Sequence, residues 1–150
     1  MSALTDLYQQ LILDHNRSPR NRRKLEPADG RAEAYNPLCG DRVTVYLLLD
    51  GDVVRDIAFE GSGCAISTAA ASMMTQRLKG KSVSEAKSLF EKFRRLLTDE
   101  HGVGDGGPEL GKLEAFGGVR RFPARVKCAT LVWHTLNAAL ENREDIVSTE

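Results

Sequence analysis

Three cysteines and one aspartate are the side chains of this sequence best suited to bind a metal ion. Cys39 and Asp41 are separated by one glycine in a loop that Pro37 stiffens, so their thiol and carboxylate can converge on one point. Cys64 follows a Gly-Ser-Gly turn and begins an expected helix, where unpaired main-chain N–H groups favour a thiolate over a thiol. Cys128 lies near the start of the last expected helix. Each cysteine is therefore at the boundary of an element and not inside an apolar stripe.

Three thiolates and a carboxylate form a donor set that suits tetrahedral Zn²⁺, and the set also suits an iron–sulfur cluster with an open position. Around Zn²⁺ these ligands leave an excess of negative charge, which the neighbouring cations Arg125 and Lys127 would offset. The cysteines are spaced by 25 and then 64 residues, which matches no zinc finger. The pattern alone therefore leaves open that these are three unrelated buried thiols.

The composition fits one domain with a hydrophobic core of its own. The chain has 150 residues, of which 41% are hydrophobic and 28% charged. Its 21 Lys+Arg balance its 21 Asp+Glu, so there is no overall basic field to attract nucleic acid or an anionic membrane. No apolar run approaches the ~18 residues of a membrane span. With an odd number of cysteines and no signal-peptide pattern, we expect a cytoplasmic, reducing location.

The hydrophobic spacing predicts an α+β fold. A first helix is expected to end near Asn16, and strands at 43–49 and 53–59 are joined by an Asp-Gly turn, with a third strand near 32–36. Further helices are predicted at 64–78, from a capping box at Ser82 to Leu97, briefly at 109–116, and at 123–140. Grouped strands of this kind indicate a three-stranded antiparallel sheet with helices packed mainly on one face.

Four motifs, in order over nearly the whole chain, resemble those of the U-type iron–sulfur assembly proteins. They lie at 13–21 (Leu-Asp-His-Asn-Arg-Ser-Pro-Arg-Asn), 39–41, 61–67 and 126–128. The scaffold (IscU-like) branch of that family has a histidine before the third cysteine, whereas the SUF (SufU-like) branch has a lysine and an insertion ahead of it. Lys127 and the stretch 104–122 resemble the SUF branch. The resemblance implies a single IscU/SufU-like domain over 1–150, with a loop or helix insertion at about 104–122.

The resemblance to the SUF branch also implies a function, a zinc-dependent sulfur acceptor that takes persulfide sulfur from a cysteine desulfurase. It implies that Zn²⁺ is held by Cys39, Asp41, Cys64 and Cys128. Cys39 is the expected acceptor, because its proline- and glycine-flanked loop would let it leave the metal and attack the outer sulfur of a persulfide. Asp41 would tune the affinity for Zn²⁺.

The expected partners follow from the same likeness. They are a SufS-like cysteine desulfurase and, further on, scaffold proteins of the SUF system. Arg125 and Lys127 would balance the charge of the site and contact the desulfurase. The chain would then act as an accessory sulfurtransferase that stimulates the desulfurase, not as a stand-alone enzyme.

Two other functions stay open from the sequence. The first is a scaffold on which a [2Fe–2S] or [4Fe–4S] cluster is built and passed on, although Lys127 stands where that branch has a histidine ligand. The second is a non-catalytic interaction domain with a structural zinc.

Other charged and aromatic positions give weaker signals. The basic run at 17–24 is expected to be a solvated loop, with a docking patch for an acidic partner surface as the alternative. His15, His101 and His134 are excluded as metal ligands, because each stands alone. The glycine-rich segment 102–107 fits a dinucleotide motif by letter but lacks the preceding strand, so a nucleotide site is not expected.

Overall fold

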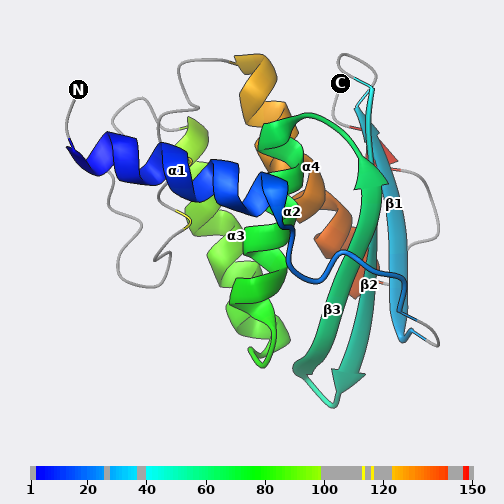
Figure 1. Ribbon diagram of the computed structural model, residues 1–150. Helices are drawn as coiled ribbons and strands as arrows, with labels where there is room; N and C mark the ends of the chain where they lie inside the picture. Colours follow the sequence, from blue (N-terminus) through cyan, green and yellow to red (C-terminus); the bar gives the residue numbers. More distant parts are fainter. Residues whose placement is uncertain are drawn as a thin grey trace.

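The computed structural model describes residues 3–25, 28–36, 40–98, 113, 116, 123–141 and 147–148. In this part of the chain, a helix is followed by three strands, three further helices and a short last strand (Figure 1). The long helices and strands begin and end within a few residues of the bounds that the hydrophobic spacing predicts. The elements are α1 (Ala3–Arg17), β1 (Gly30–Asn36), β2 (Asp41–Asp50), β3 (Val53–Ser62), α2 (Ala65–Leu78), α3 (Val83–Thr98), α4 (Pro123–Leu140) and β4 (Val147–Ser148).

The sheet has the strand order β3-β2-β1-β4. Strands β1, β2 and β3 are antiparallel neighbours, which confirms the predicted three-stranded sheet. The two-residue β4 extends it by pairing parallel to β1 at Ala34 and Tyr35. The sequence did not predict β4, because two residues carry no alternating hydrophobic pattern.

The helices pack on one face of the sheet, as predicted (Figure 1). On β2 the side chains of Val43, Val45 and Leu47 alternate toward that face and are buried. Helix α4 packs on β1 and β2, α2 packs on β3 and on α4, α1 contacts α2, and α3 contacts α4. Helix α2 lies at the centre of this layer, with small and flexible buried side chains such as Ala70, Ala71 and Met74.

Two short segments cover the outer edge of β3. The main chain around Arg22 pairs with Phe59, through Phe59 N–H to Asn21 O at 3.0 Å and Arg23 N–H to Phe59 O at 3.0 Å. The turn between α2 and α3 pairs with Val54 in the same way, Gly80 N–H donating to its carbonyl at 2.7 Å. These pairings satisfy an edge that would otherwise be open to pairing with another chain. In Figure 1 the segment that follows α1, drawn in blue, passes from this edge across the sheet toward β1.

A buried polar cluster fastens the end of α1 to α2. His15 is 2% exposed, and its Nδ1 lies 2.7 Å from the hydroxyl oxygen of Ser72. The same oxygen accepts the main-chain N–H of Arg20 at 2.8 Å, and Asn21 Nδ2 donates to Thr75 Oγ1 at 3.2 Å. Because buried polar groups are costly when unpaired, these bonds fix where the chain leaves α1. The motif at 13–21 thus has a structural role.

Most of the predicted insertion at 104–122 and the short helix at 109–116 lies outside the described residues, as does the glycine-rich segment 102–107. Leu113 and Phe116 are described, and both are buried in the core. The ring of Phe116 meets Phe93 edge-on at 5.7 Å, and Phe93 stacks on Trp133 at 5.2 Å. No helix among the described residues has the length and apolar character needed to span a membrane.

Candidate metal centre

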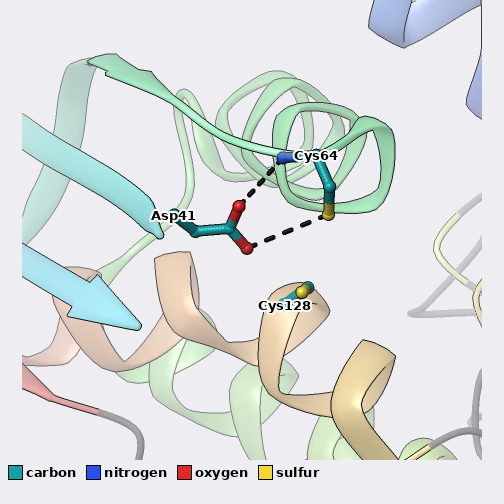
Figure 2. Close-up of side chains that lie close together, drawn as sticks. All are labelled: Asp41, Cys64 and Cys128. Carbon is teal, nitrogen blue, oxygen red and sulfur yellow. Dashed lines mark hydrogen bonds between the residues drawn. The ribbon is translucent and has the colours of Figure 1, made fainter. Parts of the chain in front are cut away.

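Three of the four predicted ligands meet at one end of the sheet. Asp41 is the first residue of β2, Cys64 caps the N-terminus of α2, and Cys128 lies in the second turn of α4. One ligand atom from each lies within 4.8 Å of the other two. Figure 2 shows the three side chains turned toward a common point from a strand and two helices. Segments 23 and 64 residues apart in the sequence are therefore brought together by the packing of α2 and α4 on β2.

The Asp41 carboxylate is fully buried and already binds the cysteine opposite it. Its Oδ1 accepts the main-chain N–H of Cys64 at 2.9 Å, and its Oδ2 lies 3.8 Å from Cys64 Sγ (Figure 2). A buried carboxylate is stable only with such partners. The first bond therefore fixes the rotation of the carboxylate, and Oδ2 is left facing the sulfur.

Cys64 is held as the N-cap of α2. Its backbone is extended, with φ −71° and ψ 171°, and its Sγ accepts the main-chain N–H of Ser67 at 3.4 Å. This is the position that serine, threonine or aspartate usually fills, where a side-chain acceptor satisfies a free N–H of the first turn. Cys64 is accessible to solvent, whereas Cys128 is only 4% exposed.

Two glycines of the turn before Cys64 allow the close approach of the ligands. A Cβ at Gly63 would lie 2.6 Å from Asp41 Oδ1, and one at Gly61 would lie 2.1 Å from the carbonyl oxygen of Arg42. Gly61 also has a φ of +146°, which L-residues rarely adopt. The importance of Gly63 was not recognised from the sequence, although the Gly-Ser-Gly turn before a cysteine is the signal that could have shown it.

The donor set fits Zn²⁺. With bond lengths of about 2.3 Å to sulfur and 2.1 Å to oxygen, a tetrahedral zinc separates sulfur from oxygen by about 3.6 Å and two sulfurs by about 3.8 Å. The observed separation of Cys64 Sγ and Asp41 Oδ2 is 3.8 Å. A shift of at most about 1 Å brings atoms that lie within 4.8 Å of one another to these spacings. Thiolate ligands also suit iron–sulfur clusters, so the donor set alone does not separate the two.

The other predicted site residues, Cys39, Arg125 and Lys127, are each within three residues of one of these ligands in the sequence. Cys39 is outside the described residues. Arg125 and Lys127 precede Cys128 in the first two turns of α4, where Arg125 is exposed and Lys127 half-buried. Arg125 is therefore about one helical turn before Cys128, and Lys127 is the residue directly before it.

The basic run at 17–24 is largely engaged within the chain. Arg20 forms an ion pair with Asp14 at 2.8 Å, and this pairing lowers the pKa of Asp14. Arg22 donates to the carbonyl of Gly61 at 2.8 Å, and both oxygens of Asp56 accept from Arg23 at 2.8 Å. These bonds give the run an intramolecular role that neither the solvated-loop interpretation nor the docking-patch interpretation included.

Neither described histidine belongs to the metal group. His15 binds Ser72, and His134 meets the ring of Phe90 edge-on at 5.1 Å. Burial lowers the pKa of His134, and the positive charge of the nearby Arg94 lowers it further. His101 lies outside the described residues.

Comparison with known proteins gives consistent matches along the chain. The model of the family described as NifU-like N terminal domain matches residues 7–147. The zinc-dependent sulfurtransferase SufU of Bacillus subtilis (strain 168) is 44% identical over 141 residues, 94% of each chain. The iron-sulfur cluster assembly scaffold protein IscU of Streptococcus pyogenes serotype M1 is 38% identical over 141 residues, 94% of this chain and 87% of that protein.

A solved structure agrees with these sequence matches. It is the crystal structure of an iron-sulfur cluster assembly scaffold protein for the SUF system from Fervidobacterium islandicum AW-1. The TM-score is 0.73 at 36% identity, and the match covers 87% of this chain and 94% of that chain. The likeness predicted from the four motifs is thereby confirmed, and the chain belongs to the family of NifU-like N-terminal domains.

Proposed function

We propose that this chain is a zinc-dependent sulfur acceptor that takes persulfide sulfur from a cysteine desulfurase for iron–sulfur cluster assembly. The observation that carries the proposal is the convergence of Asp41, Cys64 and Cys128, whose ligand atoms lie within 4.8 Å of one another. The similarity to a protein named as a zinc-dependent sulfurtransferase supports it.

Cys39 completes the proposed set of four zinc ligands. It is two residues from Asp41 along the chain, which limits the distance between their Cα atoms to about 7 Å. Bound Zn²⁺ would keep these thiols ionised without taking part in redox chemistry. Asp41, buried and fixed by the N–H of Cys64, sets how tightly the ion is held.

Sulfur transfer requires a thiolate that can reach the partner. The Cys39 thiolate attacks the outer sulfur of the desulfurase persulfide, forming a new S–S bond. The S–S bond of the desulfurase breaks, its cysteine leaves as a thiolate, and no external oxidant or reductant is needed. Cys128 is too buried for this attack, and Cys64 is held at the N-cap by Ser67 and faces Asp41. Arg125 and Lys127 offset the negative charge of the site and contact the desulfurase.

The remaining features of the proposal concern organisation and context. The chain acts as one domain over 1–150, with an insertion at about 104–122. Its partners are a SufS-like desulfurase and scaffold proteins of the SUF system, and it works in the cytoplasm as an accessory to the desulfurase.

The test combines metal analysis with sulfur uptake. The purified protein should contain one zinc per chain and should take up labelled sulfur from a desulfurase and cysteine. Cys39→Ala should abolish uptake while Asp41, Cys64 and Cys128 retain part of the zinc. Undiminished sulfur uptake by Cys39→Ala would refute the assigned role.

A scaffold function is the second candidate, because the IscU of S. pyogenes is 38% identical over 94% of this chain. Scaffold function predicts a coloured protein that transfers iron and sulfide to an apo-acceptor, whereas the proposed function predicts a colourless zinc protein. A purely structural zinc site predicts that chelation unfolds the chain. Since the core is large without the metal, we expect the helical circular dichroism to survive chelation.

A further inference from the structure

Residues 61–63, the end of β3 and the glycine after it, form the turn that presents Cys64, and two side chains bind it, one on each side. On the inner side, Asp41 accepts the N–H of Cys64 at 2.9 Å. On the outer side, Arg22 donates from its guanidinium to the carbonyl oxygen of Gly61 at 2.8 Å. Gly61, Ser62 and Gly63 are all exposed, so the outer bond is made at the surface of the molecule.

The glycines of this turn give it little stiffness of its own beyond the pairing of Gly61 and Ser62 with β2. Glycine loses more conformational freedom on folding than any other residue, and two of the three residues between Glu60 and Cys64 are glycine. Both glycines are needed, because a Cβ at either one would meet Asp41 or the backbone of Arg42. The turn therefore cannot be stiffened by its own side chains, and its conformation depends on the pairing of Gly61 and Ser62 with β2 and on bonds such as the one from Arg22.

Arg22 is itself placed by bonds to the elements that carry the site. Its two neighbours, Asn21 and Arg23, pair with the main chain of Phe59 in β3 at 3.0 Å. Asn21 also donates to Thr75 on α2, and the N–H of Arg20 binds Ser72 on the same helix. The base of the Arg22 side chain is thus fixed to β3 and α2, the two elements that the turn connects.

We propose that Arg22 is a positioning residue for the metal centre, acting through the Gly61 carbonyl on the turn that places Gly63 and Cys64 against Asp41. Its guanidinium bonds to the Gly61 carbonyl and not to any of the three described ligands, Asp41, Cys64 and Cys128. The proposal rests on the proposed function only in requiring that Asp41, Cys64 and Cys128 bind a metal. It assigns this cation of the basic run to the chain's own site and not to a partner.

Arg23 provides a matched control within the same segment. It is adjacent to Arg22, it is also exposed, and it also bonds through its guanidinium at 2.8 Å, but its partner is Asp56. Asp56 lies six residues before Ser62 on β3, about 20 Å along an extended strand. Loss of charge or of segment stability affects both variants, whereas loss of the Gly61 bond affects Arg22 variants alone.

The experiment measures metal binding by the full chain and needs no desulfurase. Zinc affinity is measured by competition with a chromophoric chelator, and the ligand geometry by the visible absorption of the cobalt(II)-substituted protein. Arg22→Ala should weaken zinc binding by about threefold to tenfold, at or below the smallest loss of affinity that is usual for residues bonded to metal ligands. It should also change the cobalt spectrum. Arg23→Ala should keep both at the wild-type value while lowering the unfolding temperature. Arg22→Lys should recover part of the affinity, because an ammonium group can also donate to a carbonyl.

The outcomes separate the two proposals. Wild-type affinity and an unchanged cobalt spectrum for Arg22→Ala would overturn the positioning role, and so would an equal loss in Arg23→Ala. A wild-type chain that binds no zinc or cobalt would overturn both proposals. Reduced affinity in Arg22→Ala, in a wild type that binds zinc but takes up no sulfur, would leave the positioning role standing and refute sulfur transfer.

Discussion

Adding one methyl group at Gly63 is expected to weaken zinc binding while the fold stays intact. Gly63 does not have a positive φ, so alanine can adopt its backbone conformation without strain. The new Cβ would lie 2.6 Å from Asp41 Oδ1, 3.1 Å from its Cγ and 3.2 Å from Ser67 Oγ. Its effect is therefore steric and falls on the buried ligand carboxylate.

The size of the effect follows from these distances. Ordinary contact begins at 3.4 Å, so the carboxylate or the turn must move by about 0.8 Å. Metal–ligand distances tolerate only about 0.2 Å, and a disturbed support behind a ligand costs about 10- to 100-fold in affinity. This corresponds to about 1.4–2.7 kcal/mol of zinc-binding free energy.

The assay is chelator competition for zinc, with urea unfolding of the same samples. Gly30→Ala is the control, because its Cβ would lie 2.5 Å from the carbonyl oxygen of Ala139 and Gly30 also lacks a positive φ. Gly30 is at the opposite end of β1 from the site, so its alanine variant should lose about 1–3 kcal/mol of stability and keep its zinc affinity. Wild-type zinc affinity in Gly63→Ala would refute the reasoning.

Two further predictions concern stability and pH. Ser72→Ala removes the hydroxyl that binds both His15 and the N–H of Arg20, so the free energy of unfolding in urea should fall by about 1–3 kcal/mol, and a value within error of wild type would contradict the role of this cluster. Asp56 is subject to burial, which raises its pKa, but bonds from Arg23, the Ile57 N–H and Lys79 together lower it below 3.8. A lowered folded pKa gives stability that is present above the unfolded value and lost as pH falls through the folded one. The advantage of wild type over Asp56→Asn should therefore be constant from pH 5 to 8 and shrink below about pH 4, and an advantage that persists to pH 2 would show that the carboxylate charge is not responsible.

The elements with long periodic patterns could be predicted from the sequence. Alternation of Val43, Val45 and Leu47 marked the buried face of β2, and Gly51 indeed turns the hairpin with a φ of +63°. The predicted capping box is present, with Glu85 N–H donating to Ser82 Oγ at 3.1 Å. The pairing of β4 with β1 and of residues 21–23 with β3 could not be predicted, because main-chain bonds over two or three residues leave no side-chain pattern.

For the site, the sequence indicated which side chains could bind a metal but not what holds them. Residue type and position at element boundaries made Asp41, Cys64 and Cys128 candidates, and the resemblance to the U-type assembly proteins implied that they bind one metal ion. The supports are different, because Gly63 and Arg22 act through contacts with residues distant in the sequence. A charge cluster such as 17–24 likewise does not reveal whether its partners are inside or outside the chain.

The register of the β2–β3 hairpin explains why Asp41 and the Cys64 turn meet. Arg42 pairs with Ser62, so continuing the pairing by one residue places Gly63 opposite Asp41, in agreement with the close contact between them. This register depends on an irregularity next to Leu48 and Leu49, where Asp56 and Val54 are the successive partners and Arg55 is the extra residue. If the strands paired without this bulge, with Arg55 opposite Leu48, every partner of β2 beyond that point would shift by one position. Ile57 and Phe59 would then face away from the helices, and Gly63 would no longer oppose Asp41. The same bulge that lets β3 bury its apolar side chains therefore also aligns the carboxylate with the cysteine.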